Sequence, residues 1–270
     1  MDRTILYQNI SISYKAFTPG ASPQVTPLIL LHGFAEDSSI WDNQTAYLKN
    51  NHRLIIPDLP GSGRSSSLPG DTSMEELAHS VKAILDAEGI TECILIGHSM
   101  GGYIALAFAE LYPDMLKAFG LFHSTSYADS DEKKAARRKG IDFIRKNGSA
   151  PFIKQSIPNL FSETSRREHP EWINTLTERY ADFNPDALIR YYEAMIRRPD
   201  RSHILQQFPR PVLFIIGEQD NTIPLNISLQ QSHMPWTSCI YILEKSGHMG
   251  MMEETARGNH ILEEFLNALI

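Results

Sequence analysis

One short segment restricts the fold more than any other part of the chain. Residues 94–102 read Ile-Leu-Ile-Gly-His-Ser-Met-Gly-Gly, an apolar run that ends in a Gly-x-Ser-x-Gly pattern, and a helix-type sequence follows at 103–111. A serine at such a tight turn between a strand and a helix needs a strained backbone and small neighbours two positions to either side, which Gly97 and Gly101 provide. We therefore predict a buried strand, a sharp turn that holds the Ser99 hydroxyl above the carboxyl edge of a sheet, and a helix whose positive end lies beneath it.

Short apolar runs of the same kind recur along the chain. They span residues 27–31, 53–56, 93–96, 118–122, 212–216 and 239–243. A continuous rather than alternating apolar character is typical of parallel strands that are buried on both faces. Residues 5–17 instead alternate with a period of two that is interrupted near Gln8 and Asn9, which predicts an opening β-hairpin. Because helix patterns lie between the runs, we predict an α/β fold built on a doubly wound, mostly parallel sheet of eight strands.

The clearest helix pattern covers residues 72–87. Thr72 and Glu75 have the spacing of a capping box, in which the two side chains satisfy backbone N–H groups of the first turn. Apolar side chains then recur on one face of the helix, at Met74, Leu77, Ala78, Val81, Ile84 and Leu85. We expect an amphipathic helix that begins at Thr72.

The alternation of strand and helix stops between residues 124 and 208, where no convincing strand pattern occurs. Ser130 can cap a helix that ends at Gly148. Asn184 followed by Pro185 starts another, because proline is favoured in the first turn of a helix. This part of the chain is therefore expected to be helical throughout.

The charge distribution marks the same region. Residues 129–201 carry 15 basic and 12 acidic side chains, whereas the whole chain has a net charge of −7. The helical region is thus positive and the remainder strongly negative. We predict a core domain of residues 1–123 and 209–270, with a helical insertion of residues 124–208 after the sixth strand.

The chemistry of Ser99 requires further residues. A serine hydroxyl is a poor nucleophile at neutral pH, so it needs a base, and the base needs a group that fixes its tautomer. Catalytic groups of such sheets gather at the carboxyl ends of strands, and His248 follows the last apolar run. Asp220 follows the run before it. Glu218 is the rival acid, but it lies only two residues beyond its strand, which is too close to reach the histidine.

An oxyanion that forms during attack needs backbone N–H donors. Met100, directly after the serine, supplies one, and Phe34 in the turn after the third strand is the candidate for the other. We expect His32 and His98 to orient these loops by hydrogen bonds rather than to act as bases. His123, where the insertion begins, is a candidate pocket residue.

Taken together, these residues resemble those of the α/β-hydrolase fold family, on its branch of lidded serine esterases and lipases. The matching segments are His32-Gly33-Phe34, Asp58-Leu59-Pro60-Gly61-Ser62-Gly63-Arg64-Ser65, Gly97-His98-Ser99-Met100-Gly101-Gly102, Gly217 to Asp220, and Gly247-His248. The resemblance implies the triad Ser99, Asp220 and His248, the oxyanion hole at Phe34 and Met100, and a helical lid in the insertion. Relatives that open epoxides or remove halides use an aspartate where this chain has Ser99.

Two function classes remain open. The first is a serine hydrolase that cleaves a small or medium carboxylic ester, thioester or lactone through an acyl-serine intermediate. The second is a ligand-binding or signalling receptor with vestigial hydrolysis. Carbon–carbon bond hydrolases, lyases and perhydrolases of the same family share these motifs, so the reaction subtype is less secure than the nucleophile. The complete set of catalytic residues favours the enzyme.

Side chains around the site give a weaker signal. Apolar candidates for the pocket wall are Phe34, Trp41, Met100, Phe122 and Met249, with Phe152 or Phe161 from the insertion, although core packing is the favoured interpretation of each. Basic residues crowd the first helix of the insertion, at Lys133, Lys134, Arg137, Arg138 and Lys139. A solvated helix face is the favoured interpretation of this cluster, ahead of a site for an anionic substrate or a coenzyme A thioester.

Composition limits the partners and cofactors. The acidic net charge of −7 argues against nucleic acid and against an anionic membrane surface. The chemistry expected of Ser99 makes a small molecule with an acyl group the expected partner. No His, Cys or carboxylate cluster has metal-ligand spacing and no dinucleotide glycine motif is completed, so we expect neither a metal nor a cofactor. The opening residues contain no secretory signal and no segment is long enough to span a bilayer, so a cytoplasmic location without stable membrane association is expected.

Overall fold

The computed structural model describes residues 1–20 and 26–269. Its centre is an eight-stranded sheet with the strand order β1-β2-β4-β3-β5-β6-β7-β8. The strands are β1 (Asp2–Tyr7), β2 (Ile10–Phe17), β3 (Leu28–Leu31), β4 (Leu54–Pro57), β5 (Cys93–His98), β6 (Leu116–Phe122), β7 (Val212–Gly217) and β8 (Ser238–Leu243). The β1–β2 and β2–β4 pairs are antiparallel and all other pairs are parallel. The predicted α/β fold is confirmed; residues 21–25 and 270 of the predicted core lie outside the described residues.

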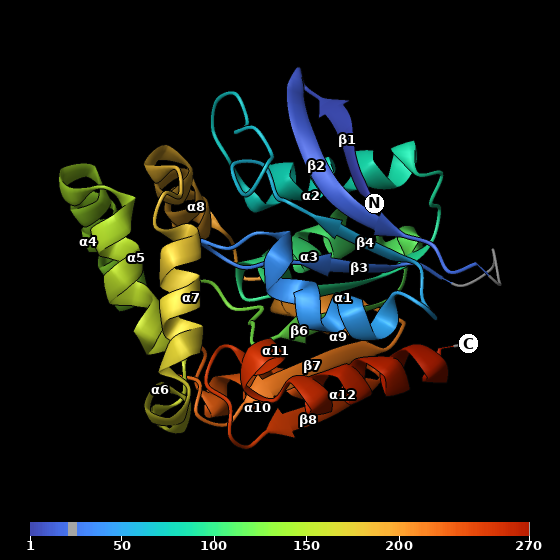
Figure 1. The fold of residues 1–270 in the computed structure, drawn as a ribbon. Coiled ribbons are helices and arrows are strands. Elements are labelled where there is room, and N and C mark those ends of the chain that lie inside the picture. Colours follow the sequence, from blue (N-terminus) through green and yellow to red (C-terminus); the bar gives the residue numbers. More distant parts are fainter. Residues whose placement is uncertain (21–25, 270) are drawn as a thin grey trace.

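Burial explains why the central strands read as continuous apolar runs. Every residue of β3, β4, β5 and β7 is buried, because helices cover both faces of the sheet there. At the edge, β8 is only half-buried and contains the half-buried Cys239, whereas Cys93 lies in the core. Figure 1 shows α1 (Asp42–Leu48), α11 (Gly250–Glu253) and α12 (Thr255–Ala268) in front of the sheet, with α2 (Met74–Ala87) and α3 (Met100–Leu111) behind it.

The start of α2 differs from the prediction. Ser73, not Thr72, is the N-cap, and its hydroxyl accepts a hydrogen bond of 3.1 Å from the N–H of Glu76. Ser73 has the extended backbone that a capping residue needs (φ −129°, ψ 168°), whereas the Thr72 carbonyl accepts a hydrogen bond from Arg197. The helix thus begins one residue later than predicted, and the Thr72 carbonyl contacts Arg197, which is distant in sequence.

Only helices lie between β6 and β7. We call this stretch, residues 123–211, the helical segment. It contains α4 (Asp131–Asn147), α5 (Ser149–Ser156), η3 (Ile157–Leu160), α6 (Glu163–Glu168), α7 (Pro170–Tyr180), α8 (Pro185–Arg197) and α9 (Ser202–Gln207). The caps predicted at Ser130, Gly148 and Asn184 are confirmed. Figure 1 shows α4 to α8 as a separate layer at one side of the sheet, while the remaining helix, α10 (Leu225–Ser232), follows β7.

Basic side chains of the helical segment hold it to the acidic core. Arg201 forms ion pairs with Glu75 on α2 and with Glu110 on α3, the latter at 2.8 Å. Arg197 donates a hydrogen bond of 2.9 Å to the Thr72 carbonyl. The opposite net charges of the two regions are therefore partly matched in specific contacts between them.

Candidate active site

Ser99 lies at the sharp turn between β5 and α3. Its backbone has φ 50° and ψ −114°, a left-handed conformation that non-glycine residues rarely adopt. A Cβ atom on Gly97 would overlap the backbone of Gly101, and a Cβ on Gly101 would lie 2.6 Å from the Leu31 carbonyl oxygen. Both positions flanking the serine therefore require glycine, as the sequence pattern predicted.

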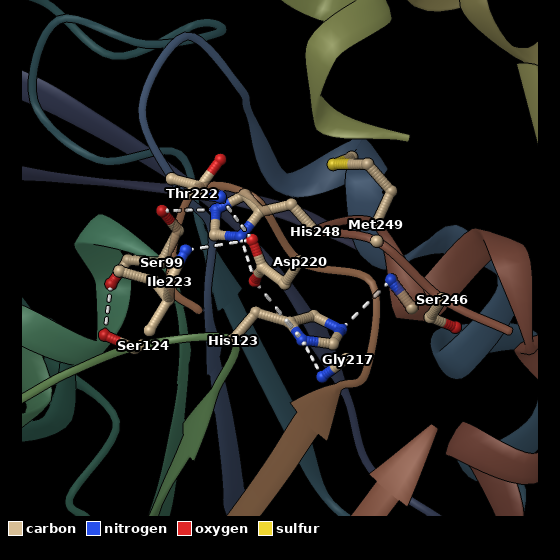
Figure 2. Close-up of polar contacts among 12 residues, drawn as sticks. Ser99, His123, Ser124, Gly217, Asp220, Thr222, Ile223, Ser246, His248 and Met249 are labelled. Atoms are coloured by element: carbon tan, nitrogen blue, oxygen red, sulfur yellow. Dashed lines mark hydrogen bonds and ion pairs between the residues drawn. The ribbon is translucent and has the colours of Figure 1, made fainter. Parts of the chain in front are cut away.

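Three side chains from three strand ends form a hydrogen-bonded chain. Nε2 of His248 lies 2.8 Å from Ser99 Oγ, and Nδ1 of His248 lies 2.7 Å from Asp220 Oδ2. Because Nδ1 faces a carboxylate, it carries the ring proton, and Nε2 is free to accept one from the serine hydroxyl. Figure 2 shows His248 between Ser99 and Asp220, which are the residues that the sequence singled out.

The carboxylate of Asp220 is held in its ionised form. Its Oδ1 accepts hydrogen bonds from the backbone N–H groups of Thr222 and Ile223, at 2.7 and 2.9 Å. Burial opposes the charged form, but His248 and the N–H donors outweigh this and lower the pKa of Asp220. Glu218, the rival acid, is exposed to solvent. The geometry thus brings Asp220, and not Glu218, to the histidine.

The two candidate oxyanion donors, the N–H groups of Met100 and Phe34, have no hydrogen-bond acceptor within the described part of the chain. Met100 is the first residue of α3, so its N–H has no intrahelical acceptor. The N–H of Phe34 makes no backbone hydrogen bond either. The neighbouring Gly33 approaches the nucleophile closely, because a Cβ placed on Gly33 would lie 3.2 Å from Ser99 Cβ. The Met100 N–H therefore lies directly after Ser99, and the Phe34 N–H lies in the neighbouring loop after β3, which lines the same cavity.

A second buried histidine–carboxylate pair lies beside the first, and the sequence analysis missed its acid. Nδ1 of His98 is 3.0 Å from Glu36 Oε2, and Nε2 of His98 is 2.9 Å from the His248 carbonyl oxygen. Burial disfavours both charges, but mutual attraction raises the pKa of His98 and lowers that of Glu36. Since both ring nitrogens face acceptors, His98 is satisfied as an imidazolium and fixes the backbone of His248.

His32 also has the orienting role that the sequence predicted. Its Nε2 accepts a hydrogen bond of 3.0 Å from the N–H of Leu59, and its Nδ1 lies 2.8 Å from the Gly33 carbonyl oxygen. Glu36 could have been noticed as one of two carboxylates, with Asp37, in the loop that follows β3, since the other site residues also follow strands. Nothing in its spacing distinguished it from a surface acid.

The prediction of His123 as a pocket residue is wrong. Its side chain is 1% exposed and lies between the loops that follow β7 and β8, where the N–H groups of Gly217 and Gly250 face its two ring nitrogens at 2.9 and 3.1 Å. Burial holds its pKa well below the usual range, so the ring is neutral. Nδ1 lies 3.8 Å from Asp220 Oδ2, and Figure 2 shows His123 on the side of Asp220 opposite His248. His123 therefore packs against Asp220 on the side away from His248.

A cavity of about 210 Å³ opens onto Ser99 and His248. Besides Ser99 and His248, the core contributes Phe34, Ala35, Glu36, His98, Tyr103, Thr222 and Met249 to its wall. The helical segment contributes Arg137, Phe152, Ile153, Ser156, Ile157, Leu160, Leu176, Tyr180, Tyr192 and Met195. Among the apolar candidates from the sequence, Phe34, Phe152 and Met249 line the cavity. Trp41, Met100, Phe122 and Phe161 are buried in the core instead. About half of the enclosure is thus built by helices outside the sheet.

One basic residue departs from the favoured interpretation of a solvated face. Arg138 and Lys139 are exposed, but the Arg137 side chain is only 12% exposed and lines the cavity. The reason is helical periodicity: Arg137 is four and seven residues before the buried Ile141 and Ile144, on the inner face of α4. That spacing was the signal in the sequence that could have identified it.

The described residues do not meet the requirements of a metal site, a disulfide or a membrane-spanning helix. Within residues 1–20 and 26–269, no group of three or more His, Cys, Asp or Glu side chains is placed to hold a metal ion. Both cysteines are free thiols. None of the described helices combines the length and apolar character needed to cross a membrane.

Known proteins share both sequence and architecture with this chain. A family model described as alpha/beta hydrolase fold matches residues 26–255. The chain is 27% identical over 250 residues to a 2-hydroxy-6-oxononadienedioate/2-hydroxy-6-oxononatrienedioate hydrolase of Paraburkholderia phymatum, across 88% of this chain and 86% of that protein. It is 25% identical to 3-oxoadipate enol-lactonase 2 of Acinetobacter baylyi, across 96% and 94% of the two chains. A malate-bound thermophilic esterase from Thermogutta terrifontis superposes with a TM-score of 0.92 at 28% identity, covering 100% of this chain and 99% of that one.

Proposed function

The chain belongs to the α/β-hydrolase fold family, and from that premise we propose that it is a serine hydrolase that cleaves a small or medium carboxylic ester, thioester or lactone. The observation that carries the proposal is the hydrogen-bonded chain from Ser99 through His248 to Asp220, with the serine held in a strained backbone conformation. A cavity of about 210 Å³ suits a substrate of that size.

In the first half-reaction, Nε2 of His248 takes the Ser99 proton as Oγ attacks the carbonyl carbon. The ionised Asp220 stabilises the resulting imidazolium through its 2.7 Å contact with Nδ1. The N–H groups of Phe34 and Met100 donate to the oxyanion of the tetrahedral intermediate. His248 then returns the proton to the leaving oxygen or sulfur atom, and the acyl group remains on Ser99.

In the second half-reaction, His248 removes a proton from a water molecule that attacks the acyl carbon. The tetrahedral intermediate again uses the two backbone donors, and its collapse returns the proton to Ser99 Oγ. The free acid leaves and the enzyme is restored. No cofactor takes part in this sequence.

We assign residues 124–208 the role of a lid over this chemistry. The cavity wall supports the assignment, because side chains of α4, α5, α7 and α8 enclose the space above Ser99. Such a cover excludes water and strengthens each electrostatic interaction inside the site. The core domain, residues 1–123 and 209–270, then supplies the reacting groups.

Hydrolysis of a carbon–carbon bond is the second candidate. It is favoured by the relative from Paraburkholderia phymatum, whose name is that of a 2-hydroxy-6-oxononadienedioate hydrolase and which aligns with 88% of this chain. The enol-lactonase and the esterase favour ester or lactone cleavage. The same nucleophile, base and oxyanion donors would serve either bond, so a direct comparison of substrates separates the two.

The test is a panel of 4-nitrophenyl esters of increasing acyl length, together with lactones and a 2-hydroxy-6-oxodienoate, assayed with the wild type and Ser99→Ala. We expect ester or lactone turnover that falls by at least about a thousandfold in the variant, because the members of a triad act as a unit. Faster cleavage of the dienoate would favour the second candidate. If both proteins react equally slowly with every compound and a ligand raises their thermal stability, the result would favour a ligand-binding receptor over an enzyme.

A further inference from the structure

Arg137 is a charged group in an otherwise largely apolar part of the cavity. Its guanidinium carbon lies 5.4 Å from the centre of the Tyr192 ring, and the neighbouring wall is formed by Phe152, Ile153 and Met195. A guanidinium stays charged even when it is buried. A permanent cation therefore faces the space in which the substrate of the proposed hydrolase would bind.

The hydrogen bonds of Arg137 leave part of the guanidinium free. Nε donates to Asp129 Oδ2 at 2.6 Å, and Nη2 lies 3.4 Å from Asp129 Oδ1. Within the part of the chain that the structure describes, Nη1 has no acceptor, and it is not among the buried polar atoms without a partner. Nη1 is thus not fully buried, and because Arg137 lines the cavity, it is available to a ligand there.

The charges around Arg137 do not cancel. Asp129 also pairs with Arg198, at 3.0 Å, so a single carboxylate serves two guanidinium groups. Lys133 adds a further cation, whose Nζ donates to the Thr222 carbonyl oxygen. The carboxylates elsewhere at the site are already committed, since Glu36 pairs with His98 and Asp220 pairs with His248. This end of the cavity therefore carries an excess of positive charge.

Tyr103 lies at the same positive end of the cavity. It lies on α3, one turn after Ser99, lines the cavity, and packs its ring 3.8 Å from the Arg198 guanidinium carbon. Burial should raise the pKa of its phenol, yet Arg198, Lys133 and Arg137 lower it below the usual value. No described residue forms a hydrogen bond with its hydroxyl. The phenol is a second donor available at the positive end.

We propose that Arg137 and Tyr103 form a carboxylate subsite, so that the substrate is an ester or lactone that also carries a carboxylate group. This rests on the proposed hydrolase function. Nη1 of Arg137 and the Tyr103 hydroxyl donate hydrogen bonds to the carboxylate while the ester carbonyl lies at Ser99. A coenzyme A thioester fits less well, because a cavity of about 210 Å³ has no room for its nucleotide and phosphates.

The subsite fixes the position of the substrate as well as its affinity. Buried hydrogen bonds to charged groups are stronger than neutral ones, and an apolar surrounding limits competition from water. A neutral ester of the same length would leave the excess positive charge without a partner and would slide within the cavity. Selectivity for the charged substrate should therefore appear in kcat/KM.

The experiment compares matched esters that differ by one charged group. Mono(4-nitrophenyl) glutarate and 4-nitrophenyl pentanoate have equal acyl lengths, and 4-carboxyphenyl acetate and 4-carbamoylphenyl acetate place the difference on the alcohol instead. Both pairs are assayed with the wild type, Arg137→Met and Arg138→Met. Arg138 is the matched control, because it is the adjacent arginine on α4 and is exposed.

We expect the wild type to prefer the carboxylate in one of the two pairs, and that pair identifies which part of the substrate reaches Arg137. In Arg137→Met the charged-to-neutral ratio of kcat/KM should fall about 10- to 100-fold, the loss typical of a hydrogen bond to a charged group. Arg138→Met should leave the ratio unchanged. Tyr103→Phe, which keeps the ring, should reduce the ratio by a smaller factor.

Two results would contradict the carboxylate subsite, and a third would contradict only the proposed hydrolase function. A wild type that prefers the neutral ester of both pairs, or an unchanged ratio in Arg137→Met, would make Arg137 a structural residue while the hydrolase stands. If no ester is cleaved in a Ser99-dependent manner, the hydrolase fails, and calorimetry of monomethyl glutarate, which carries a carboxylate, against the neutral methyl pentanoate binding to Ser99→Ala still decides the subsite. Should Arg137→Met not fold, the wild-type ester ratios and the same calorimetry decide it.

Discussion

The core and the helical segment contribute to the site in different ways. The core provides Ser99, His248 and Asp220 at the ends of β5, β8 and β7, within 2.8 Å of one another along the chain of hydrogen bonds. The helical segment provides about half of the cavity wall, including the guanidinium of Arg137. The groups proposed to react and the groups proposed to select the substrate thus come from separate parts of the sequence.

This difference has a physical basis. The groups of the core are attached to turns at strand ends, where the hydrogen-bonded sheet fixes their positions and glycine is required for close backbone approach. The groups of the helical segment project from helix faces that are held to the core by side-chain contacts such as Arg201 with Glu110. Positions in the core are therefore set by backbone geometry, and positions in the wall by side-chain packing.

The largest effect is expected from Asp220→Asn. The substitution keeps the size of the side chain but removes the charge that fixes the His248 tautomer, so kcat should fall about ten-thousandfold, or about 5 kcal/mol in activation free energy. Steady-state kinetics on a 4-nitrophenyl ester measures it. Glu218→Gln, on the same loop but exposed, is the control and should behave as the wild type. A comparable loss in Glu218→Gln and none in Asp220→Asn would reassign the acid.

The next largest effect is expected from Asp129→Asn in the helical segment, and it is a loss of stability. Removing this carboxylate leaves Arg137 and Arg198 without their shared partner, which should reduce the free energy of unfolding by about 3–5 kcal/mol. Urea unfolding at pH 7 measures it. Asp142→Asn, an exposed acid on α4, is the matched control. Equal unfolding free energies for the two variants would mean that the buried network does not stabilise the segment.

The same network has a pH signature. Burial opposes ionisation of Asp129, but Arg137 and Arg198 keep its pKa below the usual value. A lowered folded-state pKa stabilises the protein above the unfolded-state value of about 3.9, and the contribution is lost as pH falls through the folded-state pKa. Wild-type stability should therefore decline in this acid range more steeply than that of Asp129→Asn. Parallel profiles of the two proteins would contradict this assignment.

The difference between the core and the helical segment also determines which features could be predicted from the sequence. The turn at Ser99 left a clear pattern, because glycine is the only residue that fits at Gly97 and Gly101. His248 and Asp220 could be found because the loops that follow buried strands meet at one edge of the sheet. These features depend on local backbone requirements, which are written in neighbouring residues.

Features that depend on tertiary packing could not be predicted in the same way. Glu36 is one of two adjacent acids in a loop, and only the fold shows that it pairs with His98. Arg137 belongs to a run of basic residues, so its inward position had to be read from the spacing to Ile141. The helix start at Ser73 rather than Thr72 was a choice between two competent caps, and Arg197 of the helical segment contacts the Thr72 carbonyl. For Glu36 and Thr72, the deciding partner is distant in sequence.

Leu176→Ala tests whether the wall of the helical segment sets substrate size. Leu176 is 2% exposed and lines the cavity, so its truncation should cost about 2–3 kcal/mol in unfolding free energy and enlarge the cavity. The acyl length that gives the highest kcat/KM should increase, since one methylene in an apolar pocket changes transition-state binding by about 1 kcal/mol or more. Leu205→Ala is the control, because Leu205 is fully buried on α9 but lies outside the cavity wall. It should lose similar stability with no change in preferred length, and a shift in both variants would refute the role of the wall.

The smallest effect is expected at the contact between the two regions, in Tyr191→Phe. The Tyr191 hydroxyl on α8 donates a hydrogen bond of 2.7 Å to the Pro60 carbonyl oxygen and lies 3.0 Å from Ser62 Oγ, in the loop after β4. Its removal leaves a buried acceptor unpaired and should cost about 1–2 kcal/mol in unfolding free energy. Tyr192→Phe is the control, since no hydrogen bond of the Tyr192 hydroxyl is found among the described residues. If Tyr191→Phe loses no more stability than Tyr192→Phe, the helical segment is held by its ion pairs and apolar packing, and this hydrogen bond is not one of its anchors.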